Sequence, residues 1–264
     1  MKKTIPVQTC LLALALSAFV LGVQSSQGSF FYQYVGLRFP APTGWYLATD
    51  LEVAQGLQEG AQIMGLDSPE AQAVVEQMPG KVLLMLSEHP PDSDFEGFNR
   101  NILVAAIDVR GHEDELSTGP DFLAGVSQMM EESLPDVVIS EISIQRLGGE
   151  DFPKLEIQIP MEDMTVHQWQ LARIHNDYLI MLTVSAESSS GMEELSQLAD
   201  GLRFSEVSQE LDSSAEGQSF REQAAIVLPG SSGGTLLRTV GIILMVLGVI
   251  WFITSLGGST QETN

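Results

Sequence analysis

The chain's fold is decided by residues 154–186, KLEIQIPMEDMTVHQWQLARIHNDYLIMLTVSA. Apolar and polar residues alternate along 154–159, where Leu155, Ile157 and Ile159 share one face, as in a half-buried strand. Two β-rich runs follow at 165–174 and 178–186, joined by a short polar turn at 175–177. The pattern predicts a strand at 154–159 and a hairpin of 165–174 with 178–186, with Trp169 and Val184 buried.

A similar pattern precedes this stretch. Residues 137–146 alternate with Val138, Ser140, Ile142 and Ile144 on one face, and the pair Gly148-Gly149 then turns the chain toward 154–159. We therefore predict that 137–146 and 154–159 form another hairpin.

The remaining segments predict strands and helices around this sheet. A β-rich run at 30–45 ends in prolines and a glycine, which indicates a first strand and its turn. Helix 120–134 has Phe122, Val126, Met129 and Met130 on one face, and helix 190–202 has Met192, Leu195, Leu198 and Leu202. Further helices are predicted at 50–65 and 68–78, and strands at 82–86 and 102–109. The prediction is an α+β domain over 29–204, a mostly antiparallel sheet flanked by helices.

The order of these elements, together with LRFPAPTGW at 37–45, resembles the PsbP/Mog1-like fold over residues 30–205. This resemblance implies an α/β/α sandwich. It also implies a largely non-enzymatic assembly or binding role, and it transfers no catalytic residue. The helical insertion at 50–78 and the membrane anchor described below depart from the family pattern.

The N-terminus reads as a secretory signal peptide, residues 1–28. Lys2 and Lys3 precede an apolar run at 10–23 and a small polar exit. An uncleaved anchor is the alternative. Cys10 is the only cysteine, so the exported part can form no disulfide and offers no thiol nucleophile or ligand.

Near the C-terminus, residues 236–256 predict a single transmembrane helix. The run has one charge, Arg238, at its edge, and is long enough to cross a bilayer of about 30 Å. We predict a flexible linker at 205–235, with a possible short helix at 218–227, and a short cytoplasmic tail at 257–264. Alternatively, residues 231–234 are a processing site from which the apolar tail is removed.

The predicted exported part is strongly acidic, with 34 Asp and Glu against nine Lys and Arg between residues 29 and 235. Such a surface repels nucleic acid and anionic lipid headgroups. Basic partners and divalent cations remain compatible with it.

Two groups of residues bear on chemistry. Asp92, Asp94, Glu96 and Gly97 match the opening of a calcium loop, but Leu103 stands where the bidentate glutamate belongs, so a hydrated loop is the competing interpretation. On one strand face, His167, Trp169, Arg173 and His175 could line a ligand groove, or Trp169 could pack under a helix with the histidines near strand ends. His112 has Leu116 where a zinc motif needs histidine.

The sequence therefore favours a membrane-tethered extracytoplasmic binding or assembly-factor module that is not an enzyme. It would be a single-pass cell-membrane protein with its main domain outside, a protein partner, no nucleic acid, no cofactor and no catalytic or metal-binding residue. The rival hypothesis is an extracytoplasmic hydrolase or metal-dependent enzyme with a His/carboxylate cleft. A weaker third places the interaction in the span, through Gly241 and Gly248.

Overall fold

The computed structural model describes residues 29–40, 42–48, 81–90, 95, 97–110, 119–133, 137–160 and 164–225. The strands are β1 (Ser29–Tyr32), β2 (Leu37–Pro40), β3 (Tyr46–Leu47), β4 (Lys81–Ser87), β5 (Asn101–Asp108), β6 (Val138–Ile139), β7 (Ser143–Leu147), β8 (Glu150–Pro160), β9 (Thr165–His175), β10 (Tyr178–Ala186) and β11 (Arg203–Phe204). The helices are α4 (Gly119–Ser133), α5 (Ser189–Ala199), α6 (Gln209–Asp212) and α7 (Ala215–Ala224).

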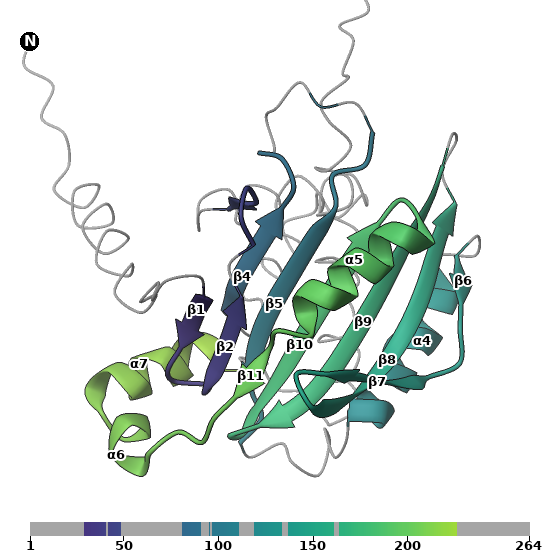
Figure 1. Cartoon of the computed structure of the whole chain (residues 1–264). Helices are drawn as coiled ribbons and strands as arrows, with labels where there is room; N and C mark the ends of the chain where they lie inside the picture. Colours follow the sequence, from purple (N-terminus) through teal and green to yellow (C-terminus); the bar gives the residue numbers. More distant parts are fainter. Residues whose placement is uncertain are drawn as a thin grey trace, which may run out of the picture.

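A large antiparallel sheet forms the centre of the molecule, in the order β3-β4-β5-β10-β9-β8-β6, with β7 also paired to β8 (Figure 1). A small second sheet, β1-β2-β11, lies beside it. Helix α5 covers one face of the large sheet and α4 the other (Figure 1). The predicted α+β class with a mostly antiparallel sheet is confirmed over the described residues.

The two long hairpins form because their turns suit a right-handed strand twist. Asn176 and Asp177 have φ of 48° and 62°, and Gly148 and Gly149 have 61° and 90°, values typical of two-residue hairpin turns. At Gly148, a Cβ would meet the Leu202 carbonyl oxygen at 1.9 Å, so a side chain is excluded as well. The predicted pairing of β9 with β10 and the predicted turn at Gly148-Gly149, between β7 and β8, are confirmed.

Alternation along the strands builds two cores. Along β5, Ile102, Val104 and Ala106 face the α5 side, whereas Leu103, Ala105 and Ile107 face the α4 side. The helices contribute their predicted apolar residues to these cores. Phe122, Val126 and Met130 of α4 and Met192 and Leu195 of α5 are buried, as is Leu202 after it.

The prediction of one continuous strand at 137–146 is wrong. The segment is broken into β6 and β7, which both pair with β8, so the residues between them change the phase of the alternation. As a result, the four residues predicted on one face separate: Val138 and Ile144 are each 61% exposed, whereas Ile142 packs against the core, as does Ile139. The first predicted strand is also corrected. It forms the hairpin of β1 and β2, turned at Gly36, whose φ is 66°.

The predicted linker is corrected over its first part. Residues 209–224 form α6 and α7, and α7 places Phe220 and Ala224 in the core on the α5 side of the sheet. Ala225 then pairs with Asp108 in a parallel bridge at the end of β5. The folded domain therefore extends to residue 225, because the apolar face of α7 is buried against the sheet.

Several predictions fall outside the described residues. These are the signal peptide at 1–28, the helices at 50–65 and 68–78, the rest of the linker, the span at 236–256 and the tail at 257–264. Within the described residues, no helix is both long and apolar enough to cross a membrane.

Candidate functional site

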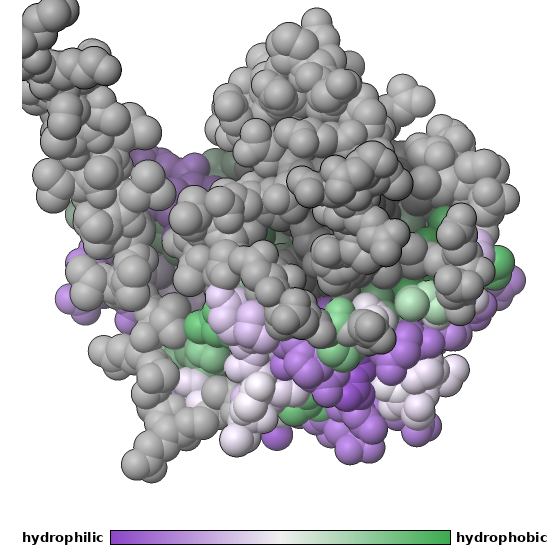
Figure 2. Space-filling model, turned by 90° about the horizontal axis from the view of Figure 1, so that it is seen from above, coloured by the Kyte–Doolittle hydropathy of each residue, from purple (hydrophilic) through white to green (hydrophobic). Residues whose placement is uncertain are grey.

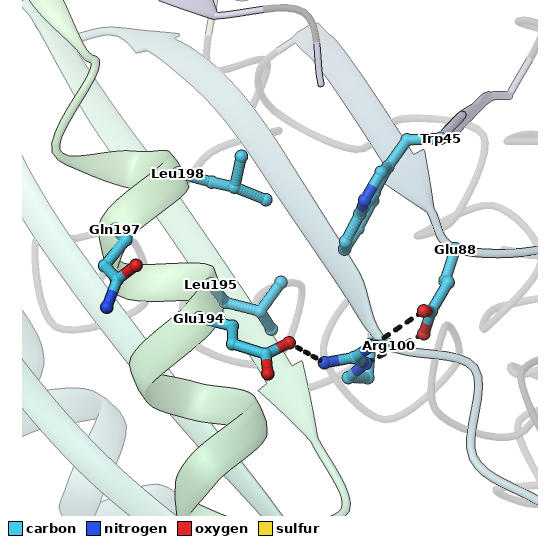
Figure 3. A pocket seen from close by; sticks show the side chains of 7 residues that line it. All are labelled: Trp45, Glu88, Arg100, Glu194, Leu195, Gln197 and Leu198. Carbon is cyan, nitrogen blue, oxygen red and sulfur yellow. Dashed lines mark hydrogen bonds and ion pairs between the residues drawn. The ribbon is translucent and has the colours of Figure 1, made fainter. Parts of the chain in front are cut away.

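An open groove lies between α5 and the ends of β3, β4 and β5 (Figure 3). It has a volume of about 420 Å³. The residues that line it are Trp45, Glu88, Arg100, Glu194, Leu195, Gln197 and Leu198. Figure 3 shows Trp45 and Leu198 on opposite sides of the opening, with the charged side chains gathered at one end.

Local structure brings these residues together. The Glu88 backbone N–H donates to the Arg100 carbonyl oxygen at 3.0 Å, which extends the pairing of β4 with β5 by one step and places both side chains at the sheet end. On the helical side, the Ser188 hydroxyl caps α5 by accepting from the Gly191 N–H at 3.1 Å. This cap fixes the start of α5 and hence the position of Glu194 on its second turn.

Arg100 links the two sides of the groove. Its Nε and Nη2 donate to the two Glu88 carboxylate oxygens at 2.8 and 2.7 Å, a bidentate arrangement. Its Nη1 donates to Glu194 Oε2 at 2.5 Å. The hydrogen bonds that Arg100 donates to Glu88 raise the pKa of Arg100 above its ordinary value and lower the pKa of Glu88 below its own. Both groups are therefore held in their charged forms.

The groove combines apolar walls with an uneven charge balance. One guanidinium faces two carboxylates, so this end of the groove has a formal charge of −1. The Glu194 side chain is 66% exposed, against 31% for Glu88. Trp45 is half-buried and Leu195 is fully buried against the core. Such a site can hold a ligand by contact and charge.

A second arginine cluster lies at the opposite end of β5. Arg110 binds the Asp108 carboxylate and approaches Asp212 of α6, with 3.5 Å between Nη1 and Oδ1. Arg221 of α7 pairs with the same Asp212. We call these four residues the clasp, because they join α6 and α7 to the sheet. The clasp contains two cations and two anions and is formally neutral.

An aromatic contact supports the clasp. The Phe220 ring stacks on Tyr34 with centroids 5.3 Å apart and meets Tyr178 edge-on at 5.7 Å. Arg110 Nη2 donates to the Tyr178 hydroxyl at 3.3 Å. Burial raises the pKa of Tyr178 above its ordinary value. The clasp region is therefore a packed structural contact.

The histidines predicted as candidate groove residues do not converge. His167 and His175 lie at opposite ends of β9, eight residues apart, which corresponds to roughly 27 Å along a strand. The His175 ring lies 3.0 Å from the Ser205 carbonyl oxygen and meets Phe204 edge-on. His175 therefore occupies a structural position near the small sheet.

The other members of that strand face are also engaged in the fold. Arg173 pairs with Glu150 at 2.8 Å. Trp169 is half-buried, and Lys154 Nζ lies 4.2 Å from the centre of its ring. The prediction that Val184 is buried is confirmed, whereas Trp169 is only partly covered.

The calcium prediction stays a prediction, because Asp92, Asp94 and Glu96 lie outside the described residues, as does His112. Of that loop, the Phe95 ring stacks on His89 at 4.2 Å and Gly97 has a φ of 115°. In the part of the chain that the structure describes, no three His, Cys, Asp or Glu side chains are grouped as a metal site.

The sheet also carries a buried polar row on its α4 side. Ser87, Asn101, Ser185 and Gln168 lie side by side on four neighbouring strands and are all buried. Gln168 Nε2 donates to the Ser185 hydroxyl at 3.2 Å, and Gln170 Nε2 donates to Gln168 Oε1 at 3.3 Å. This row links the strands to one another and does not line the groove.

The surface around these features is mixed in polarity. In the view of Figure 2, hydrophilic residues predominate along the lower edge and hydrophobic ones form small separate areas.

The groove was not predicted from the sequence, because Trp45, Arg100 and Glu194 come from three distant segments. One signal was available: Arg100 is one of only nine basic residues between 29 and 235.

No protein-family model matches the chain, and no curated protein matches it. Several solved structures do match the chain. A protein of Bacteroides thetaiotaomicron is 8% identical with a TM-score of 0.37; the match covers 68% of this chain and 48% of that one, about half its length. The solution structure of PsbP from Synechocystis is 16% identical with a TM-score of 0.41, and the match covers 70% of this chain and 99% of that one.

LpqN of Mycobacterium tuberculosis, described as involved in cell envelope biogenesis, is 15% identical with a TM-score of 0.33, and the match covers 62% of this chain and 78% of LpqN. The PsbP/Mog1-like resemblance is thus a weak similarity of fold. It carries no argument about function, which rests on the groove.

Proposed function

We propose that the chain is a membrane-tethered extracytoplasmic module that binds a protein partner at the groove and catalyses no reaction. The single observation that carries the proposal is the Arg100 cluster beside apolar walls. Its side chains offer fixed charges and contact surface at an open site on the domain.

The electrostatics of the cluster support binding over proton transfer. A general acid or base works best when its pKa lies near the working pH. The mutual hydrogen bonds raise the pKa of Arg100 and lower that of Glu88, which moves both away from neutrality. Fixed charges of this kind orient a partner without exchanging protons with it.

The groove walls supply the contact that a protein partner needs. Aromatic side chains in partly covered positions are frequent energetic centres of interfaces, and Trp45 is placed in this way beside Leu198. The charged end of the groove would orient the partner. The proposed extracytoplasmic location rests on the signal-peptide pattern at 1–28, and the proposed membrane tether rests on the apolar run at 236–256.

Photo-crosslinking in intact native cells tests the proposal. The full-length chain carries benzoylphenylalanine in place of Trp45, which keeps an aromatic group at the groove wall. A matched variant carries it in place of Ile144, an exposed residue on β7. We expect one adduct of defined mass from position 45 that is absent from position 144 and is lost when Leu198→Asp is added.

The contrary results are equally defined. Equal adducts from both positions, no adduct from position 45, or an adduct that persists with Leu198→Asp would each contradict binding at the groove. Folding of the Leu198→Asp variant is checked by its circular dichroism spectrum and thermal midpoint.

A further inference from the structure

We propose that the groove receives a lysine or arginine side chain of the protein partner, with an apolar residue beside it. This inference rests on the proposed binding function and adds the chemistry of the ligand. It is argued from the charge balance, from the exposure of Glu194 and from the apolar walls.

The charge balance disfavours an anionic ligand. Among the described residues that line the groove, Arg100 is the one cation, and three of its N–H donors already bind Glu88 and Glu194. A carboxylate or phosphate would have to approach Arg100 between two carboxylates that repel it. A cation meets a formal charge of −1 instead.

Glu194 is the carboxylate available to that cation. Both Glu88 oxygens accept from Arg100, in a bidentate pair whose Glu88 side chain is 31% exposed. The Arg100 bond to Glu194 uses Oε2 alone, and the Glu194 side chain is 66% exposed. A basic side chain can therefore bind Glu194 without breaking the Arg100–Glu88 pair.

The walls fit the stem of such a side chain. Lysine and arginine combine a charged head with an aliphatic stem that packs on apolar surface. Figure 3 shows Trp45 and Leu198 facing each other across the opening, with Glu194 and Arg100 at its end. The stem would lie between indole and leucine, where the aromatic face also attracts the cation.

Long-range electrostatics also favour a positively charged ligand. Residues 29–235 include 34 acidic and nine basic residues, so the field around the domain attracts positively charged segments. Such a field raises the rate of encounter and is weakened by salt.

Nuclear magnetic resonance of the full chain in neutral detergent micelles tests the inference. The indole N–H signal of Trp45, assigned with Trp45→Phe, is followed during titration with acetyl-Gly-Lys-Leu-Gly-amide. Two matched peptides replace the lysine with norleucine or glutamate. We expect the lysine peptide to shift the signal, the norleucine peptide to bind about fivefold more weakly, and the glutamate peptide to bind least.

A pair of variants locates the acceptor. Glu194→Gln should weaken the lysine peptide about fivefold and leave the norleucine peptide unchanged. Glu193→Gln removes the same charge from the neighbouring exposed position of α5, outside the groove lining, and should have little effect.

The inference is overturned if lysine and norleucine peptides bind equally, if the glutamate peptide binds best, or if no peptide shifts the signal. It is also overturned if both glutamate variants have the same effect. These results leave the crosslink from position 45 intact. Conversely, lysine-peptide binding without that crosslink would contradict the proposed function alone.

Discussion

The two ends of β5 carry the same motif, an arginine between two carboxylates, in two different settings. At the groove, Arg100 binds Glu88 and Glu194 beside an open cavity, and no second cation is found among the described residues that line it. At the clasp, Arg110 binds Asp108 and approaches Asp212, which also pairs with Arg221, and the aromatic rings of α7 and the sheet pack nearby. The comparison indicates that a packed cluster of zero net charge holds helices and sheet together. An open cluster with a net negative charge is instead available to a ligand.

The largest expected effect is at the clasp. Phe220 is 8% exposed and contacts both Tyr34 and Tyr178, so Phe220→Ala should lower the free energy of unfolding by about 3 kcal/mol. Chemical denaturation measures this. Glu222→Ala, an exposed position on the same helix, is the control and should change stability by less than about 0.5 kcal/mol. An unchanged midpoint for Phe220→Ala would mean that α7 is not part of the folding unit.

The next largest effect is the difference in stability between substitutions of Arg110 and Arg100. Arg110→Met leaves the Asp108 carboxylate, 12% exposed, without its guanidinium, and should cost about 2 kcal/mol of unfolding free energy. Arg100→Met leaves two more exposed carboxylates, and should cost about 1 kcal/mol. Arg146→Met, at an exposed position, serves as the baseline. If Arg100→Met lost more unfolding free energy than Arg110→Met, the assignment of the clasp to stability and of the groove cluster to binding would be contradicted.

These differences also explain what the sequence could predict. The hairpin of β9 and β10 was predictable because alternation and turn residues are local signals, and the turn from His175 to Tyr178 contains two positive-φ residues. The break between β6 and β7 was not, because its phase depends on pairing with β8. Likewise, the sequence indicated a possible short helix at 218–227 but not the burial of Phe220, because tertiary packing decides whether such a helix joins the core.

The candidate site was harder to predict than the fold. Its residues combine a loop before β3, the β4 and β5 ends and helix α5, so no local spacing joins them. By contrast, His167 and His175 shared a strand face in the sequence pattern but lie at opposite ends of that strand. Shared alternation places residues on one face without bringing them close together.

Acid should affect the groove end through Glu88. Because Arg100 lowers the Glu88 pKa in the folded state, this pair stabilises the fold above the unfolded pKa of about 4.3 and loses that contribution as pH falls through the folded value. Thermal midpoints between about pH 5 and pH 3 should therefore fall less in Arg100→Met than in the parent chain. Parallel curves for the two proteins would argue against the contribution of this pair.

The smallest expected effect is that of salt. Raising NaCl from about 0.05 to 0.5 M should weaken lysine-peptide binding several-fold, because Glu194 is exposed and screened. The thermal midpoint of the protein should change little, since the Phe220 contacts with Tyr34 and Tyr178 beside the clasp are aromatic and are not screened by salt. Salt-independent peptide binding would indicate purely apolar recognition in the groove.

Under the proposed anchoring at 236–256, the parallel bridge between Asp108 and Ala225 would limit how far the domain can stand from a bilayer. Only ten residues, 226–235, separate Ala225 from the proposed anchor, a reach of at most about 35 Å, where a free segment from 205 would have reached about 105 Å. The described chain ends at Ala225, beside Asp108 at one end of β5, and the groove opens at the Arg100 end, roughly 27 Å away along the strand. The module would therefore stand close to its membrane with the groove directed outward, and a partner embedded in the same bilayer would need a stalk tall enough to reach past the domain.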